Sequence, residues 1–363
     1  MTPARPLALR PGFRFATLVP VALAAAACGT KMARSPSDGA GHDGASDAEA
    51  PVDGSVGGNG DAIGEDGATR TCSGPPGLYA PGSCERLAAG VERFAPRHAL
   101  WSDGADKERH LWLPAGARVD TSDPDAWVFP VGTRVWKTFV RDGLRIETRE
   151  LHKVGTGVGP DAWVMRVFAW NATQDAVHEV HDGVENALGT SHDVPPVAAC
   201  VRCHDGAARD VLLGVSAIQL AHDGAGITLR RLLDEERLTH PIDPEAARIP
   251  GPPVVRDALG YLHANCGSCH GGELPQASLD LWVDVGLTSP EQTAAYRTAV
   301  GVPSLWTAPG ADRRVEPARP EASVLLVRMR RRGDGAAMPP LATEIVDTDG
   351  VALVSAWIAT LVP

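Results

Sequence analysis

The sequence predicts an α+β protein, with an antiparallel β-rich N-terminal domain followed by mainly α-helical modules. Two observations lead to this prediction. Between residues 126 and 170, β-branched and aromatic runs are separated by Arg141-Asp142-Gly143-Leu144, whose Asp-Gly pair favours a tight hairpin turn. After residue 250, three stretches show the apolar spacing of helices: VVRDALGYLHAN, EASVLLVRMRRR and DTDGVALVSAWIATLV.

The N-terminus is predicted to be an export signal. Arg5, Arg10 and Arg14 precede an apolar run that is too short to span a bilayer and that ends in small residues. The run ends in LAAAAC, which resembles a bacterial lipobox with Cys28 as the lipidated first residue of the mature protein. The alternative is an ordinary signal peptide cleaved after Ala27. We expect the protein to be exported and held at a membrane through a lipid anchor only.

A polar linker follows the expected anchor. From Asp38 to Asp66 there are eight acidic residues and no Lys or Arg, so the stretch cannot bury apolar surface and should be disordered. Much of the net charge of −11 therefore belongs to the linker. The chain has no basic stripe of the kind that binds nucleic acid. Gly29, rather than Asp, follows Cys28, which by analogy with bacterial lipoproteins favours the outer membrane, facing the periplasm or the cell surface.

The β-rich domain contains several expected strands. AWVFPVGTRVWKTFV forms one, and WVMRVFAW forms another. LRIETREL alternates, with Leu144, Ile146 and Thr148 on one face and Arg145, Glu147 and Arg149 on the other. Six tryptophans fall in this domain, and we favour core packing for them over a carbohydrate-stacking platform: Trp101, Trp112, Trp127, Trp136, Trp163 and Trp170.

The seven cysteines divide into distinct classes. Cys28 lies at the lipobox. Cys72 and Cys84 flank a Pro/Gly-rich loop and are expected to form a disulfide, because an exported compartment is oxidising. The other four form two Cys-x-x-Cys pairs, each followed directly by histidine.

The two pentapeptides Cys200-Val201-Arg202-Cys203-His204 and Cys266-Gly267-Ser268-Cys269-His270 have the pattern of c-type haem attachment. The two thiols add to the vinyl groups of one haem, and the adjacent histidine binds the iron. A shared zinc site is disfavoured because 62 residues separate the pairs. A thioredoxin-like motif would need a βαβ context. We therefore expect two covalently attached haem c groups.

The second motif has a candidate sixth ligand. Met338 precedes two prolines in a loop between two predicted helices, and its thioether is a soft neutral ligand. The first motif has no equivalent methionine. His222 and His240 lie downstream as candidates, and His178, His181, His192 and Met165 lie upstream. An open or water-bound sixth position is the remaining alternative.

Residues 253–363 resemble a class I cytochrome c domain: helix, CGSCH, helix, MPP and C-terminal helix. Residues 90–363 as a whole resemble secreted diheme c-type cytochromes with an N-terminal β-rich domain. The shared stretches are LWSDGADKERHLWLPAG, FPVGTRVWKTF, IETREL, AWNATQDA, PPVAACVRCH, LGVSAIQL and YLHANCGSCH with MPP. The family stretch differs at SDGADKERH, so no inherited role passes to His110.

The expected organisation has five segments: a signal peptide (1–27), a lipidated linker (28–69), the β-rich domain (70–195), a first haem module (196–252) and a cytochrome c domain (253–363). The resemblance implies electron transfer between extracytoplasmic donor and acceptor proteins rather than catalysis. Two alternatives remain: a peroxidase- or oxidase-like enzyme with an open first haem, and a module that binds a glycan or protein and is coupled to the cytochromes.

Overall fold

The computed structural model describes residues 71–363 apart from 207–209, 273–275 and 342, and these described residues fall within one compact unit, Ala62–Pro363. The predicted signal peptide, the lipidation site at Cys28 and the predicted linker lie outside the described residues. Within the described part, no helix has both the length and the apolar character needed to cross a bilayer.

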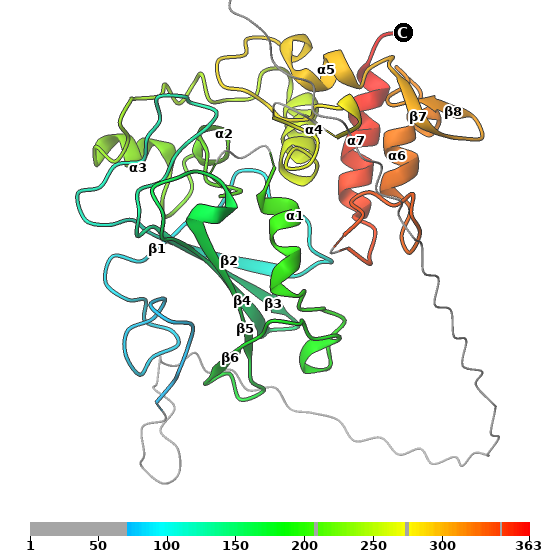
Figure 1. The fold of residues 1–363 in the computed structure, drawn as a ribbon. Helices are drawn as coiled ribbons and strands as arrows, with labels where there is room; N and C mark the ends of the chain where they lie inside the picture. The colour runs from blue at the N-terminus through cyan, green and yellow to red at the C-terminus, as the bar shows by residue number, and fades with distance from the viewer. Residues whose placement is uncertain (1–70, 207–209, 273–275, 342) are drawn as a thin grey trace, which may run out of the picture. The chain divides into compact units, whose positions relative to one another are not determined.

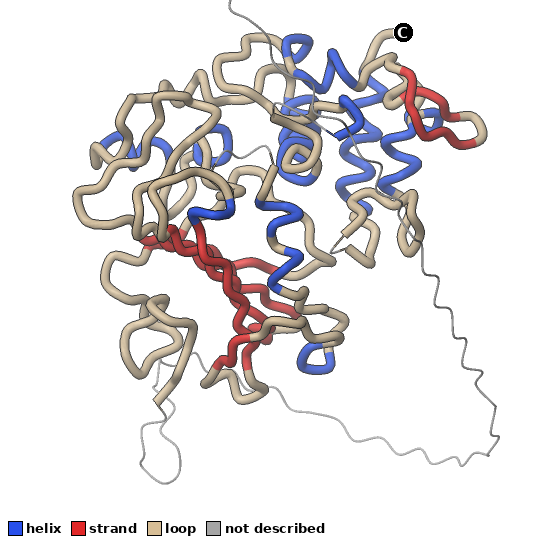
Figure 2. Tube along the Cα trace, in the orientation of Figure 1, coloured by secondary structure: helices blue, strands red, loops and turns tan. Residues whose placement is uncertain are grey.

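A six-stranded antiparallel sheet forms the β-rich part (Figures 1 and 2). Its strands are paired in chain order, which makes it a meander as predicted. The strands are β1 (Glu92–Arg93), β2 (Asp106–Trp112), β3 (Arg134–Arg141), β4 (Leu144–Lys153), β5 (Trp163–Trp170) and β6 (Val177–Glu179).

The turn between β3 and β4 is the predicted Asp-Gly hairpin. Asp142 and Gly143 have φ of 51° and 77°, the left-handed values that a two-residue hairpin of this type requires. The strand predicted from residue 126 is wrong in its first half, because β3 begins only at Arg134. Pro130 lacks a backbone N–H, and the Thr133 N–H donates to the Pro130 carbonyl to form a turn.

The predicted alternation along β4 is also wrong, because a bulge interrupts it. Phe139 is paired with Glu147 but Val140 is paired with Arg145, so Ile146 is the extra residue. Ile146 joins the buried cluster that contains Val167 of β5. Thr148, expected on the same face, lies on the opposite face.

Both faces of the sheet are covered. Leu78 and Val91 of the N-terminal segment pack with Trp136 on one face. Helices α2 (Ala217–Leu220) and α3 (Leu229–Asp234) share a core cluster with Leu111, Val135, Leu151 and Trp163 on the other. Four of the six tryptophans are buried, as core packing predicts: Trp127, Trp136, Trp163 and Trp170.

The C-terminal part is built on α4 (Pro253–Asn265), α6 (Val324–Met329) and α7 (Thr348–Thr360), at the three predicted positions. Trp357 of α7 is fully buried in the cluster that contains Leu259 and Leu262 of α4. The hairpin of β7 (Pro303–Ala308) and β8 (Ala311–Arg313) was not predicted. The remaining elements are η1 (Pro160–Ala162), η2 (Ala187–Gly189), η3 (Val197–Ala199), α1 (Val201–His204), η4 (Gln276–Ser278), η5 (Pro290–Gln292), α5 (Ala294–Thr298) and η6 (Pro320–Ala322).

Two glycines show how closely α4 is packed against its neighbours. A Cβ on Gly260 would lie 2.1 Å from the ring of His98, a loop residue, so Gly260 does not face a helix. A Cβ on Gly350 of α7 would lie 2.4 Å from the ring of Tyr261. The close α4–α7 approach is therefore between Tyr261 and Gly350. The mixed α+β class is confirmed.

Candidate functional site

The first pentapeptide is attached to the β-sheet. Helix η3, which leads into it, packs against β5. Cys200 and Val197 lie against the buried cluster of Ile146 and Val167. The Val197 N–H also donates to the carbonyl of His181. The sheet therefore forms part of the surroundings of the first pentapeptide.

His204 is oriented by the backbone. Its Nδ1 donates to the Val211 carbonyl at 2.7 Å, which leaves the Nε2 lone pair for another partner. Burial lowers the pKa of His204 to about 4, and the nearby Lys137 and Arg149 cations contribute to this lowering. The ring is therefore neutral at neutral pH, as a metal-binding imidazole must be.

The carbonyl that orients His204 belongs to a strained residue. Val211 is fully buried and has φ of 57°, a left-handed value that is rare for a β-branched side chain. The preceding Asp210 is fixed by hydrogen bonds from the Phe129 N–H at 2.7 Å and the Trp163 Nε1–H at 2.8 Å. It also forms a buried ion pair with Lys153 of β4. These contacts hold the strained backbone in place.

The second pentapeptide ends α4 and has the same histidine arrangement. The Cys266 N–H still donates to the Leu262 carbonyl of the helix. His270 Nδ1 donates to the Gln276 carbonyl at 2.9 Å, again leaving Nε2 available. Burial lowers the pKa of His270.

The two pentapeptides lie next to each other despite their separation in the chain. The Sγ of Cys269 is 3.8 Å from the carbonyl oxygen of Arg202. A Cβ on Gly206 would lie 1.8 Å from the Ser268 carbonyl oxygen, so only glycine permits this approach. No pattern in the sequence signals this proximity, because both contacts are made to backbone carbonyls.

The cysteines differ in their bonding. Cys72 and Cys84 form a disulfide with a Cα–Cα distance of 5.6 Å. All four cysteines of the pentapeptides are free and half-buried. Burial raises the pKa of Cys266 to about 12, which keeps it a thiol. Among the described residues no group of three or more His, Cys, Asp or Glu side chains is placed to hold a metal ion.

Met338 lies in a loop that shares a partner with the second pentapeptide. Its N–H donates to the Arg328 carbonyl at 3.2 Å, and Arg328 Nε donates to the Ala336 carbonyl at 2.8 Å. The same Arg328 contributes to the lowered pKa of His270. Met338 itself is half-buried.

A loop between β1 and β2 fixes the segment that follows Met338, and sequence reasoning missed it. The Asp103 carboxylate accepts hydrogen bonds from the Glu344 and Ile345 N–H groups. Trp101 Nε1 donates to the Ile345 carbonyl at 3.2 Å. The Trp101 N–H donates to the side chain of Asn265, the residue before Cys266. The β-rich part thus holds both sides of the second site.

The two downstream histidine candidates for the first site are engaged elsewhere or exposed. His222 Nε2 donates to the Ala95 carbonyl at 2.8 Å, and its Nδ1 accepts from the Gly224 N–H. His240 is exposed, and its Nδ1 lies 3.1 Å from the Thr239 hydroxyl. Both ring nitrogens of His222 are therefore already hydrogen-bonded, and within the described part of the chain no hydrogen bond joins either histidine to His204.

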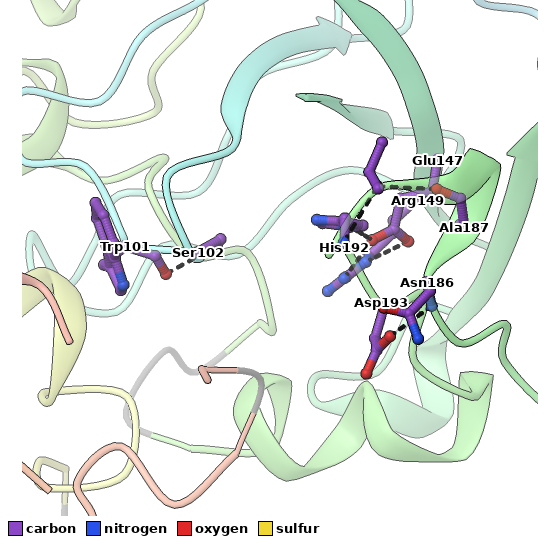
Figure 3. Close-up of polar contacts among 9 residues, drawn as sticks. Trp101, Ser102, Glu147, Arg149, Asn186, Ala187, His192 and Asp193 are labelled. Atoms are coloured by element: carbon purple, nitrogen blue, oxygen red, sulfur yellow. Dashed lines mark hydrogen bonds and ion pairs between the residues drawn. The ribbon is translucent and has the colours of Figure 1, made fainter. Parts of the chain in front are cut away.

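A charged group on the sheet face adjoins the first pentapeptide. The Glu147 carboxylate binds Arg149 through two hydrogen bonds and lies 2.8 Å from His192 Nε2 (Figure 3). Burial opposes ionisation of Glu147, but Arg149 and His192 outweigh it and lower its pKa to about 2. Lys137 and Arg149 also act on the cysteines Cys200 and Cys203, whose pKa values burial raises.

No family model, curated protein or solved structure matches the chain. The function is therefore inferred from the two sites themselves.

The donor chemistry of both sites fits haem c. Each offers two free thiols separated by two residues and a histidine whose Nδ1 is hydrogen-bonded to a backbone carbonyl. Cys200, Cys203 and His204 would hold one group; Cys266, Cys269 and His270 would hold the other, with Met338 on the loop beside it.

Proposed function

We propose that the protein is an exported diheme c-type cytochrome that carries electrons between a donor and an acceptor protein, with a class I cytochrome c fold in residues 253–363. The observation that carries this proposal is the contact between the two CxxCH pentapeptides, in which Cys269 Sγ lies 3.8 Å from the Arg202 carbonyl oxygen. The histidine of each pentapeptide is fixed through its Nδ1. Bound haems would supply Fe(III)/Fe(II) couples, and the chain supplies ligands, a low dielectric and a docking surface.

Different residues would contribute to haem attachment, electron transfer and membrane anchoring. The cysteines would hold each haem covalently. The backbone carbonyls fix the histidine rings, so the histidines would stay in place when the charge on a bound iron changes. Adjacency of the two pentapeptides favours transfer within the chain. Met338 at the second site would raise its potential relative to a bis-histidine site. The Cys28 lipid anchor would keep the protein near membrane-bound partners.

The deciding experiment is intact mass after expression in a host that attaches haem c. The full chain should gain two haem masses. Replacing Cys200 and Cys203 with alanine should remove one, and replacing Cys266 and Cys269 should remove the other. Replacing Cys72 and Cys84 is the matched control and should leave two. Absence of added haem, with zinc bound instead, would refute the proposal.

The hydrogen bonds of His222 and the exposure of His240 favour testing a second function. If no protein group fills the sixth position at the first site, that site would bind small ligands and support peroxidase- or oxidase-like chemistry. A high-spin signal that peroxide or cyanide abolishes would support the enzyme. A fully low-spin spectrum for both haems would exclude it.

A further inference from the structure

The face of the sheet beside the first pentapeptide has an excess of positive charge. Lys137 on β3 is paired with Arg109 on β2 and with Arg149 on β4. The three side chains therefore lie on one face of the sheet. Lys107 lies two residues before Arg109 on the same face. Like charges in direct opposition destabilise a sheet, so this row needs a reason.

Most of this charge lacks an ion-pair partner within the described part of the chain. Of these four cations, only Arg149 has an ion-pair partner among the described residues, and that partner is Glu147. Lys137 Nζ lies over the Phe139 ring at 4.9 Å, and Lys107 Nζ donates to the Leu100 carbonyl. Burial and the neighbouring cations lower the pKa of Lys137 to about 7 and that of Lys107 to about 8. In the absence of an anion this arrangement costs stability.

The row begins at the first pentapeptide. Val167 of β5, against whose cluster Cys200 packs, is directly opposite Arg149. Lys137 and Arg109 then follow on the next two strands, each about 4.8 Å further along the sheet. Lys137 and Arg109 are half-buried, so their side chains keep accessible surface. The cations are therefore on the same face as Cys200 and increasingly far from it.

We infer that Arg109 and Lys137, supported by Arg149, form the cradle for the two propionates of the haem attached at Cys200 and Cys203. This rests on the proposed function. In haem c the thioether bonds and the propionates are at opposite edges of the ring. Cys200 against the cluster of β4 and β5, and cations over β3 and β2 that have no ion-pair partner in the described part of the chain, match that order. Carboxylates paired with Arg and Lys form strong charge-assisted hydrogen bonds. On this account the β-sheet is a wall of the first haem site.

The test uses the full chain with Lys137→Gln, Arg109→Gln and the double variant. Arg166→Gln is the matched control, since Arg166 lies on the opposite face of β5 and pairs with Glu179. Each variant is made with both haems and in a Cys200→Ser/Cys203→Ser background that lacks the first. Removing the cations should stabilise the background without the first haem, because repulsion is relieved. It should destabilise the diheme form, because the propionates lose their partners.

Two spectroscopic readouts accompany the stability measurements. The double variant should lower the midpoint potential of the first haem and leave that of the second unchanged. Redox-difference infrared spectra should show shifted propionate carboxylate bands in this variant only. Lys137→Arg should preserve both wild-type readouts, which guards against a general folding defect. If the double variant has the same effect on stability with and without the first haem, and the carboxylate bands do not move, the cradle is refuted.

Two further outcomes would count against the cradle. If phosphate added to the wild-type diheme protein shifts the first-haem potential as strongly as the double variant does, the cations bind solution anions and the cradle is wrong. If no haem is attached at Cys200 and Cys203 in any form, the proposed function fails as well.

Discussion

At the scale of single residues, hydrogen bonds to backbone carbonyls orient the rings of His204 and His270. A carbonyl is fixed only as well as the segment that carries it. For His204 that segment is strained at Val211 and anchored through Asp210 to Lys153, Trp163 and the Phe129 N–H. Asp210 is therefore a positioning residue for the first site, although it contacts neither thiol nor imidazole directly.

Asp210→Asn tests this role. It leaves Lys153 buried without its counter-charge, which we expect to cost roughly 3–5 kcal/mol of unfolding free energy. The double variant with Lys153→Met should recover most of this loss but not the orientation of His204. Urea unfolding measures the first effect. The midpoint potential of the first haem reports the orientation of His204. It should change in both variants, and the midpoint potential of the second haem should stay constant. Unchanged potentials would make the anchor purely structural.

His110 provides a pH-dependent test of stability. It is 1% exposed, and neither ring nitrogen has a hydrogen-bond partner among the described residues. Burial, with help from Arg93, lowers its pKa from 6.5 to about 4. Between pH 6.5 and 4, His110 is protonated in the unfolded chain but neutral in the folded chain. The free energy of unfolding should therefore fall as the pH drops from 6.5 to 4. The total loss is on the order of 3 kcal/mol.

The variant for this test is His110→Phe, with the exposed His178→Gln as control. The difference between wild-type and His110→Phe unfolding free energies should change steadily as the pH falls through this window, since the other histidines contribute equally to both. His178→Gln should parallel the wild type. Parallel curves for His110→Phe would mean that the buried ring is not held neutral.

At the scale of elements, α4 and α7 show how closely two helices are fitted. The ring of Tyr261 on α4 occupies the space that a side chain at Gly350 of α7 would fill. Alanine is the better helix former by about 1 kcal/mol, so propensity alone favours Gly350→Ala. Packing against the tyrosine ring opposes it.

We expect Gly350→Ala to destabilise the protein by about 1–3 kcal/mol, the usual cost of overpacking. Tyr261→Leu in the same chain should remove most of that penalty, giving a large coupling energy in a double-mutant cycle. Thermal or urea unfolding of the four proteins provides the measurement. Additive effects would show that the two helices approach less closely than the structure indicates.

Sequence patterns predicted elements better than they predicted contacts. The hairpin at Asp142-Gly143, the strand at 163–170 and the helices α4 and α7 follow from local chemistry and are present. Of the stretch EASVLLVRMRRR, only Val324–Met329 forms an α-helix. The bulge at Ile146 does not, because register depends on the partner strand. The loop from Trp101 to Asp103 was also missed, since its hydrogen bonds join residues far apart in the sequence. For the candidate sites, spacing identified the pentapeptides but not their adjacency.

At the scale of the whole molecule, the β-rich part and the helical part build both sites together. Cys200 packs against the sheet, and the Asp103 carboxylate accepts hydrogen bonds from the backbone that follows Met338. The two haems we propose would therefore be close neighbours with different surroundings.

The variant Met338→Ala should change the midpoint potentials of the two haems by different amounts. Loss of a thioether ligand should lower the midpoint potential of one haem. The other should move only slightly, through the altered charge nearby. Spectroelectrochemical titration of the diheme protein resolves the two couples. Equal shifts in both would show that Met338 is not specific to the second site.

The Cys72–Cys84 disulfide has a consequence for biogenesis. If the chain is exported as proposed, six thiols besides Cys28 reach an oxidising compartment, where they can pair in 15 ways. Cys72 and Cys84 must form a disulfide, while the four cysteines of the pentapeptides must stay reduced until haem is attached. Cys72 and Cys84 are only 12 residues apart in the chain, so they meet with little loss of chain entropy. The two cysteines of each Cys-x-x-Cys pair are even closer in the chain, so they also form a disulfide readily. That disulfide must be reduced again, or haem must be attached before it forms. The yield of mature protein should therefore depend on a reductant dedicated to those pairs.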